Sequence, residues 1–419
     1  MSFFRRILTP FVAAALVAGA AVAQTPPSAP PHPMPTVPRP VVPVMPVPPP
    51  PDVDAQSWVL MDYATGQILA SKNPDERRAP ASLTKVMTDY VVSAEIAAGR
   101  IHPDDMVTIS EHAWRAGGGG TDGSTSFLKL GSQVKLEDLL KGMIVQSGND
   151  AAIALAEHAA GSEDAFANLM NAYAKQLGMA NTHYSNASGY PVDDHYSTAR
   201  DIAILSRALI HDFPDDYAIS KIKEFEWNGI KQQNRNALLW RDPAVDGIKT
   251  GHTSAAGFCL DASAKRGDER MIAVVMGSST DKGRADAAMA LLNYGFRFYE
   301  THKLYDASKP LATPRLWKGE ANQLPIGVAG NVLVTVKTGQ YDKLKATMDI
   351  PATLIAPFKK GQQVGTLRVT LDGQPIQSVP LIALEDAPQG GFFSRLWDSI
   401  LLWFHGSKKA DAAAAPGAK

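Results

Sequence analysis

The sequence predicts an α/β domain with an antiparallel sheet and a helical insert, followed by a small all-β domain and a C-terminal amphipathic helix. Strand-like runs stand at both ends of residues 53–302, and a long region with apolar residues at helical spacing separates them. Short alternating runs divided by turn residues fill residues 303–388. Strands at both ends with helices between them favour a layered domain whose terminal strands meet in one sheet.

Residues 1–23 are typical of a secretory signal peptide, because two arginines precede an apolar stretch that ends in a small-residue cleavage signal. The stretch is too short to span a bilayer, so we expect export and cleavage. Residues 24–52 are predicted to form an extended spacer, since 14 of the 26 residues in 26–51 are proline. A ligand for a proline-binding partner module is the alternative interpretation of this spacer.

Local patterns locate the elements of the two domains. In the first domain we expect strands at 58–62, 257–263 and 271–276, and helices across 139–160 and 165–177. In the second domain we expect strands at 332–336, 345–350, 364–371 and 379–384. The chain contains no internal repeat.

Residues 389–406 are predicted to form an amphipathic helix that lies on a membrane surface. Its apolar residues recur at helical spacing and are Phe393, Leu396, Trp397, Ile400, Leu401 and Phe404. Two tryptophans and the lysines that follow favour a helix that lies in the lipid headgroup region of the membrane. The stretch is too short to cross a bilayer. Docking on the protein's own core is the alternative. Residues 407–419 are expected to be a disordered tail.

The composition excludes several classes of protein. The 419 residues include 41 Lys and Arg against 42 Asp and Glu, and 45% are hydrophobic, which is ordinary for a globular protein and gives no basic surface for nucleic acid. The single cysteine, Cys259, can form no internal disulfide and lies in an apolar run, so we expect a small buried hydrophobe.

Two further patterns in the sequence predict no functional site. The ten histidines show no spacing typical of metal ligands, so neither a metal nor another cofactor is expected. Residues 118–123 match Gly-x-Gly-x-x-Gly, but no strand precedes them and no helix follows. We therefore expect a flexible loop near the cleft rather than a nucleotide site.

A serine nucleophile needs a base, and a lysine three residues later on a helix lies on the same face one turn away. The sequence contains five such pairs: Ser82/Lys85, Ser126/Lys129, Ser132/Lys135, Ser220/Lys223 and Ser279/Lys282. Only the first pair follows a proline at a helix start and continues in a buried-helix pattern, whereas the second alternates like a strand and the fifth lies in a polar turn. The helix N-terminus would place backbone N–H groups beside Ser82 Oγ, and burial and a neighbouring cation would lower the pKa of Lys85.

Two other short motifs complete this set. Ser147-Gly148-Asn149 offers a hydroxyl that can relay protons and an amide that can hold a substrate carbonyl. Lys249-Thr250-Gly251-His252-Thr253 offers a cation, hydroxyl donors for a carboxylate, and a glycine that lets substrate approach the strand. Each short pattern also occurs a second time, at residues 71–73 and 337–339, so neither is specific by itself. The three motifs in this order within one α/β domain, however, form a known catalytic signature.

Together these motifs resemble the low-molecular-mass penicillin-binding, serine-active-site D-alanyl-D-alanine carboxypeptidases, which have a serine β-lactamase/transpeptidase-like domain. The resemblance covers about residues 53–404, and the further segments that carry it are 75–78, 146–151, 234–236, 246–253 and 295–298. The proline-rich spacer is not part of the family pattern.

The resemblance implies a mechanism on these residues. Lys85 would take the proton of Ser82, which attacks the peptide bond before the terminal D-alanine of a peptidoglycan stem peptide, and water would hydrolyse the acyl-enzyme. Ser147 and Lys249 would pass a proton to the leaving amine, and the backbone N–H groups of Ser82 and His252 would hold the oxyanion. Candidates for binding the terminal carboxylate are Thr250, Thr253, Arg235 and, more weakly, Arg284. Family members often carry His where this chain has Ser188.

The resemblance also implies partners and a location. β-Lactams are expected to be covalent inhibitors, and peptidoglycan maturation and cell shape are the expected roles. The protein is expected in the periplasm, attached through its C-terminal helix to the outer face of the inner membrane.

Two alternative functions stay open at this point. A serine β-lactamase needs a carboxylate that activates the deacylating water, typically in Glu-x-x-Leu-Asn, but Met289 stands three residues before Leu292-Asn293. A non-catalytic envelope scaffold or glycan-binding protein is the alternative from another class.

Overall fold

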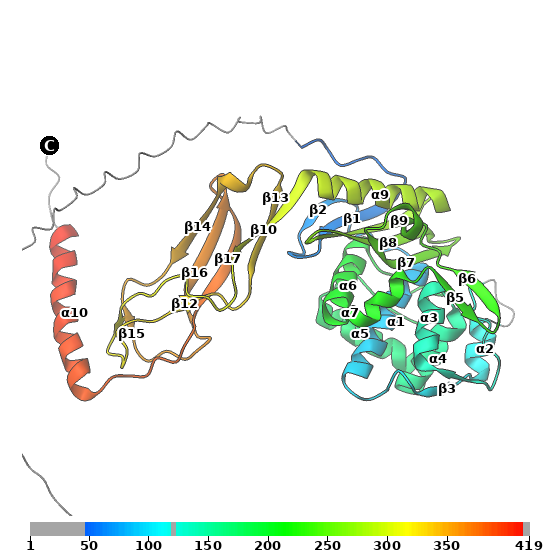
Figure 1. Ribbon diagram of the computed structural model, residues 1–419, viewed down its shortest axis with the longest axis horizontal. Helices are drawn as coiled ribbons and strands as arrows, with labels where there is room; N and C mark the ends of the chain where they lie inside the picture. Colours follow the sequence, from blue (N-terminus) through cyan, green and yellow to red (C-terminus); the bar gives the residue numbers. More distant parts are fainter. Residues whose placement is uncertain (1–46, 119–122, 414–419) are drawn as a thin grey trace, which may run out of the picture. The chain divides into compact units, whose positions relative to one another are not determined.

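The computed structural model describes residues 47–118 and 123–413. It confirms the predicted fold class, since an α/β domain is followed by a β domain and a terminal helix (Figure 1). The predicted signal peptide, most of the proline-rich spacer and residues 119–122 of the glycine-rich loop lie outside the described residues.

A five-stranded antiparallel sheet forms the centre of the α/β domain, with strand order β2-β1-β9-β8-β7. The strands are β1 (Ser57–Asp62), β2 (Ile68–Lys72), β7 (Val245–Thr253), β8 (Gly257–Arg266) and β9 (Glu269–Ser278). β1 pairs with β9 over its whole length, so the terminal strands of the domain meet as predicted. This order leaves β2 and β7 at opposite edges of the sheet.

Helices cover both faces of this sheet (Figure 1). α9 (Asp281–Phe298) packs on one face, where Leu60 and Leu291 share a core. The insert between β2 and β7 packs on the other face, where Val59 and Met87 share a second core. In chain order the insert contains η1 (Ala81–Leu83), α1 (Thr84–Ala97), β3 (Met106–Thr108), α2 (Glu111–Gly117), β4 (Gln133–Lys135), α3 (Leu136–Val145), α4 (Asn149–Ala160), α5 (Glu163–Leu177), α6 (Ala199–Asp212), α7 (Pro214–Tyr217), η2 (Ala218–Lys221), β5 (Glu224–Trp227), β6 (Ile230–Gln233) and α8 (Leu238–Arg241).

Two expectations for the insert were wrong. The predicted helix over 139–160 is two helices, α3 and α4, because the chain bends at residues 146–148, where Ser147 has a left-handed φ of 64°. The strand-like alternation at 126–130 forms no strand, since Phe127 has a φ of 57° and the backbone is held by a neighbouring carboxylate instead of by a sheet.

The β domain is built from short antiparallel pairings around its own core. Its elements are β10 (Tyr299–Tyr305), β11 (Leu316–Trp317), β12 (Ile326–Gly327), β13 (Val332–Lys337), η3 (Tyr341–Lys343), β14 (Leu344–Asp349), β15 (Leu354–Ile355), β16 (Gln363–Leu371) and β17 (Gln374–Ala383). The four predicted strands overlap β13, β14, β16 and β17. The predicted domain boundary after residue 302 falls inside β10, which follows α9 directly and pairs with β13.

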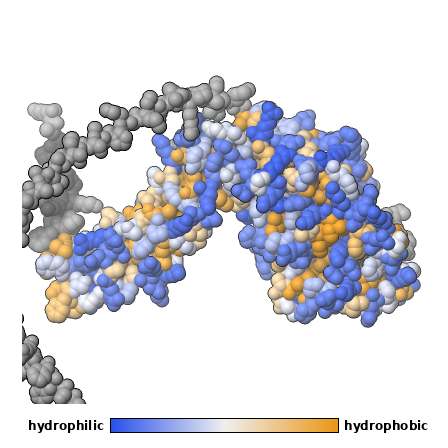
Figure 2. Space-filling view, viewed as in Figure 1, coloured by the Kyte–Doolittle hydropathy of each residue, from blue (hydrophilic) through white to orange (hydrophobic). Residues whose placement is uncertain are grey.

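The terminal helix α10 (Phe392–Ala413) begins close to the predicted start but runs further, so residues 407–413 are not the disordered tail that was expected. Most of the apolar side chains described in its first three turns are exposed, with Phe393 at 82% and Trp397 at 64%, and Figure 2 shows apolar surface at the start of this helix. Among the described residues, no helix combines the length and the apolarity needed to cross a membrane.

The last residues of the predicted spacer, 47–52, are described and contact the α/β domain. Val47 packs against the core beneath α9, and the Tyr294 hydroxyl donates to the Pro48 carbonyl oxygen (2.9 Å). The end of the spacer is therefore attached to the domain and is not a free tether.

Candidate active site

The predicted nucleophile Ser82 lies in η1, directly before α1. The Leu83 N–H donates to the Pro80 carbonyl oxygen (3.1 Å), and Ala81 has a left-handed φ of 49°. Ala81 and Leu83 are both buried, which anchors the turn on either side of the serine. This sharp turn presents the Ser82 side chain to an open cleft.

Lys85 lies in the first turn of α1 and is fully buried. Its Nζ donates to Ser82 Oγ (2.9 Å), Asn149 Oδ1 (2.7 Å) and the Ser188 carbonyl oxygen (2.6 Å). Burial, reinforced by the positive charge of Arg235, lowers the pKa of Lys85 to about 7. An amine with this pKa is substantially neutral at neutral pH, so it can accept the Ser82 proton.

Ser147, Gly148 and Asn149 form the bend between α3 and α4. The left-handed backbone of Ser147 brings its side chain to the cleft, while Asn149 begins α4 beside Lys85. A Cβ at position 148 would overlap Ser126 Oγ and lie 2.9 Å from the Ser126 nitrogen. Packing against Ser126 therefore requires glycine in the middle of this motif.

Asp150 follows this motif and holds the loop that forms the opposite wall of the cleft. Its buried carboxylate accepts hydrogen bonds from the backbone N–H groups of Ser126 (2.8 Å) and Leu128 (3.1 Å) and from the Thr125 hydroxyl (2.9 Å). The Ala151 N–H is a fourth donor (2.9 Å). Buried carboxylates are stable when their acceptors are satisfied in this way.

Strand β7 carries the third motif along the other side of the cleft. Lys249 is buried, and its burial together with the charge of Lys85 lowers the pKa of Lys249 well below its usual value. Gly251 lines the cleft, and a Cβ there would lie 3.0 Å from the Pro80 carbonyl oxygen and 3.3 Å from the Leu83 nitrogen. The glycine lets β7 pack against the turn that holds Ser82.

The two candidate arginines differ in their partners. Arg235 donates to Ser124 Oγ (2.7 Å), which lies on the loop held by Asp150. Arg284 is almost completely buried and donates to the carbonyl oxygens of Gly251 (2.9 Å) and Cys259 (3.1 Å), while it also pairs with Asp281. Arg284 therefore holds the ends of β7 and β8, and Arg235 is the better candidate for a substrate carboxylate.

These elements enclose a cleft of about 510 Å³. Nine of the predicted site residues line it: Ser82, Ser147, Asn149, Arg235, Thr250, Gly251, His252, Thr253 and Arg284. The other two, Lys85 and Lys249, are buried beneath it. Within the described part of the chain, no group of three or more His, Cys, Asp or Glu side chains could hold a metal ion.

Comparisons with known proteins agree with this geometry. A family model described as D-alanyl-D-alanine carboxypeptidase matches residues 44–280, and one for the C-terminal domain of penicillin-binding protein 5 matches residues 299–389. The D-alanyl-D-alanine carboxypeptidase DacC of Escherichia coli is 48% identical over 358 residues, which cover 85% of this chain and 90% of the relative. The chain belongs to the D-alanyl-D-alanine carboxypeptidase family of penicillin-binding proteins.

Solved structures of this carboxypeptidase family share the fold. Penicillin-binding protein 5 from Haemophilus influenzae has a TM-score of 0.78 at 44% identity and covers 81% of this chain and 99% of its own. Penicillin-binding protein 6B from Escherichia coli has a TM-score of 0.68 at 40% identity and covers 80% of this chain and 98% of its own.

A loop forms the third wall of the cleft, and the sequence analysis did not predict its place in the site. Ser188, Gly189 and Tyr190 line the cleft, and the only signal for them was the departure from His at position 188. The Ser188 carbonyl oxygen, not its side chain, accepts from Lys85, while the Ser188 hydroxyl donates to Asn186 Oδ1 (3.3 Å). The contact of this loop with Lys85 is therefore independent of the side chain at 188.

His195 connects the same loop to the start of α1. Its Nδ1 accepts from the Ser185 N–H (3.1 Å), so its Nε2 donates to Thr84 Oγ1 (2.8 Å). Burial lowers the pKa of His195 to about 4, which keeps the ring neutral and this tautomer in place. Nothing in the sequence pattern indicated this contact, because the two residues are 111 positions apart.

Proposed function

We propose that this chain is a serine-type D-Ala-D-Ala carboxypeptidase, which removes the terminal D-alanine from peptidoglycan stem pentapeptides and binds penicillin covalently. The observation that carries the proposal is the buried Lys85 Nζ, 2.9 Å from Ser82 Oγ, beneath a cleft lined by the other two motifs. Family membership supports the same reaction. The corresponding role is peptidoglycan maturation and the control of cell shape.

The first step forms an acyl-enzyme. Neutral Lys85 accepts the Ser82 proton, and Ser82 Oγ attacks the carbonyl carbon of the peptide bond between the two D-alanines. The backbone N–H groups of Ser82 and His252, on the turn and on β7, are our candidates for donors to the oxyanion. Donors fixed on packed backbone stabilise such a charge without reorganising during the reaction.

The second step releases D-alanine and regenerates the serine. Ser147, with Lys249 beneath the cleft, passes the proton that Lys85 took from Ser82 to the leaving nitrogen as the C–N bond breaks, which returns Lys85 to its neutral form. Water then attacks the ester carbon, one of its protons returns to the serine oxygen through Lys85, and the shortened peptide leaves as a carboxylic acid.

The terminal carboxylate of the substrate has three candidate partners among the residues that line the cleft. Arg235 supplies a guanidinium, and Thr250 and Thr253 supply hydroxyls. A guanidinium can form paired hydrogen bonds with a carboxylate, which favours a substrate with a free C-terminus over an internal peptide bond. Asn149 is our candidate for holding a carbonyl oxygen of the stem peptide.

Release of D-alanine from a synthetic pentapeptide that ends in D-Ala-D-Ala tests this function. We expect release by the unchanged protein and a loss of at least about a thousandfold in Ser82→Ala, as for removal of other serine nucleophiles. Ser132→Ala is the matched control, because Ser132 belongs to another Ser-x-x-Lys pair and lies outside the cleft. Equal release by Ser82→Ala would contradict the proposal. So would a complete lack of release by the unchanged protein, which is the result expected of a non-catalytic scaffold.

We further propose that α10 attaches the exported protein to the outer face of the inner membrane. Phe392, Phe393 and Trp397 are exposed by 67%, 82% and 64%. On another side of the helix the buried carboxylate of Asp398 accepts from the Lys318 N–H (2.5 Å) and pairs with Arg315 (3.4 Å). The polar contacts hold the helix to the β domain and leave Phe392, Phe393 and Trp397 exposed, where they can enter a lipid surface.

A further inference from the structure

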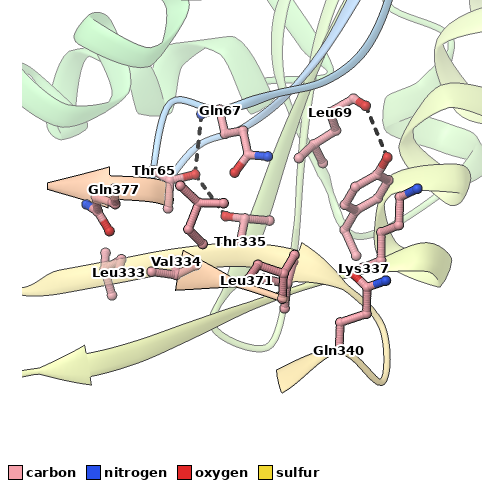
Figure 3. Close-up of a pocket in the computed structure, with 13 residues that line it drawn as sticks. Thr65, Gln67, Leu69, Leu333, Val334, Thr335, Lys337, Gln340, Leu371 and Gln377 are labelled. Atoms are coloured by element: carbon pink, nitrogen blue, oxygen red, sulfur yellow. Dashed lines mark hydrogen bonds between the residues drawn. The ribbon is translucent and has the colours of Figure 1, made fainter. Parts of the chain in front are cut away.

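A second open groove lies away from the catalytic cleft, between the β1–β2 hairpin and strands β13, β16 and β17 (Figure 3). We call it the hairpin groove. It is lined by Thr65 and Gln67 of the hairpin, by consecutive residues of β13 and by Gln377 of β17. Because the hairpin includes edge strand β2 and the catalytic motif lies on β7, the two sites are at opposite edges of the five-stranded sheet.

The walls of this groove are fixed by a buried carboxylate. Asp62 Oδ1 accepts from Thr65 Oγ1 (2.6 Å) and Thr335 Oγ1 (2.9 Å), and its Oδ2 accepts from Thr301 Oγ1 (3.0 Å). The two threonine oxygens at 65 and 335 also lie 2.8 Å apart. These contacts join the hairpin to β10 and β13, so the groove is formed before any ligand arrives, which lowers the entropic cost of binding.

The groove has polar side chains with unused hydrogen-bonding capacity. Within the described residues, the side chains of Gln67, Gln340 and Lys337 form no hydrogen bond or ion pair. Gln377 Oε1 is buried and has no hydrogen-bond partner there. A buried amide oxygen such as Gln377 Oε1 is costly unless a ligand or water completes its hydrogen bonds, whereas Gln67 and Lys337 are exposed at the mouth of the groove.

Apart from two threonines and a tyrosine, the rest of the lining is apolar, and the groove carries side-chain charge of only one sign. Leu333, Leu371 and Ile376 contribute aliphatic surface beside the amides, and Figure 3 shows Leu333 and Leu371 below Gln67. The lining contains no Asp or Glu, and Lys337 is its single charged residue. The groove is therefore suited to a ligand that has hydroxyl and amide groups, some apolar C–H surface and no positive charge.

We propose that the hairpin groove binds the glycan chain of peptidoglycan, a polymer of N-acetylated amino sugars. Each sugar ring has an apolar C–H face and a rim of hydroxyl and acetamide groups, which match the aliphatic surface and the free amides. The groove volume of about 510 Å³ lies in the range of about 300–1,000 Å³ typical of ligand sites. The choice of this polymer rests on the proposed function, because stem peptides are attached to it.

Titration of the full chain with chitotetraose, a peptide-free tetramer of N-acetylglucosamine, tests this site. We expect saturable binding by calorimetry, weakened about threefold to tenfold in Gln67→Ala and in Gln377→Ala, as for loss of one or two hydrogen bonds. Gln133→Ala, at an exposed glutamine on β4, is the matched control and should bind like the unchanged chain. No binding, or equal binding by all variants, would overturn the proposal, as would binding of an extended peptide in place of the glycan.

A second measurement separates this proposal from the proposed function. D-Alanine release from a short pentapeptide should be equal in the groove variants and the unchanged chain, whereas release from intact sacculi should fall in the groove variants alone. Glycan binding without any release from either substrate would overturn the proposed function and retain the groove. Release from both substrates at unchanged rates in the variants would overturn the groove and retain the function.

Discussion

Lys85 sets the pH at which Ser82 becomes reactive. Burial, and after it the positive charge of Arg235, lowers the pKa of Lys85 to about 7. The neutral amine is the base, so the rate of acylation by penicillin should rise with pH through a midpoint near 7. Arg235→Gln removes the nearby charge and should move this midpoint to higher pH, whatever its effect on the maximal rate.

Stopped-flow acylation between pH 5 and 9 measures the midpoint. Arg241→Gln is the control, since Arg241 is a half-exposed arginine paired with Asp286 and lies outside the cleft. A midpoint that does not move in Arg235→Gln would contradict this account of the lysine.

Asp261 on β8 is a buried acid that the reaction does not use. Burial raises its pKa to about 8, and its Oδ2 lies 2.5 Å from Ser206 Oγ. Between about pH 4 and pH 8 the folded protein keeps the Asp261 proton that the unfolded chain loses. The contribution of Asp261 to the free energy of unfolding should therefore fall as the pH rises through this window, by up to about 1.4 kcal/mol per pH unit.

Chemical denaturation across this pH window compares the chain with Asp261→Asn, which cannot titrate. The free energy of unfolding of the unchanged chain should fall relative to that of the variant as the pH rises. A constant difference would show that Asp261 is ionised in the folded protein.

At the scale of elements, the contact between β7 and η1 positions the nucleophile. Gly251→Ala would place a Cβ 3.0 Å from the Pro80 carbonyl oxygen. We expect penicillin acylation to slow by at least about tenfold, because a displacement near 1 Å in a catalytic group can cost a hundredfold. Gly330→Ala is the matched control, since a Cβ there meets nothing within 4 Å. Unchanged acylation in Gly251→Ala would contradict this role of the strand.

The motifs could be predicted from sequence because each contains its chemistry in consecutive residues. The break between α3 and α4 could not, because apolar periodicity continues through the bend. The contacts made there, from the Asn149 N–H to the Ser124 carbonyl oxygen and from Lys85 to Asn149 Oδ1, join residues that are distant in sequence. The irregular loop at 124–128 has the same cause: Asp150 replaces the sheet partner that its alternation suggested. The requirement for glycine at 148 and 251 likewise arises from neighbours that are distant in sequence.

The terminal helix should bind lipid through its aromatic side. Phe393→Ser with Trp397→Ser removes two exposed aromatic side chains, so we expect at least about a tenfold loss of binding to vesicles of anionic and zwitterionic phospholipids. Ser394→Ala on the same helix is the control, and D-alanine release should be equal in all three proteins. Vesicle binding that survives the double substitution would contradict attachment through α10.

At the scale of the whole molecule, the sequence predicted two domains and their order but not how they join. The junction depends on Asp62 and Thr335, which are 273 positions apart and carry no local signal. The second copies of the two short patterns are likewise separated by the fold: Lys337 is on β13 and Ser71 is on β2, whereas the three functional motifs converge on one cleft. Convergence in space, and not the presence of any one motif, distinguishes the site.

The central claim is that Ser82 is the acylated nucleophile of a penicillin-binding carboxypeptidase. Intact-mass spectrometry after incubation with benzylpenicillin, followed by peptide mapping, measures it most directly. The account predicts one penicilloyl adduct per chain, located on Ser82, absent from Ser82→Ala and slowly hydrolysed. An adduct on another residue, no adduct, or rapid turnover to penicilloate would contradict it, and rapid turnover would identify a β-lactamase instead.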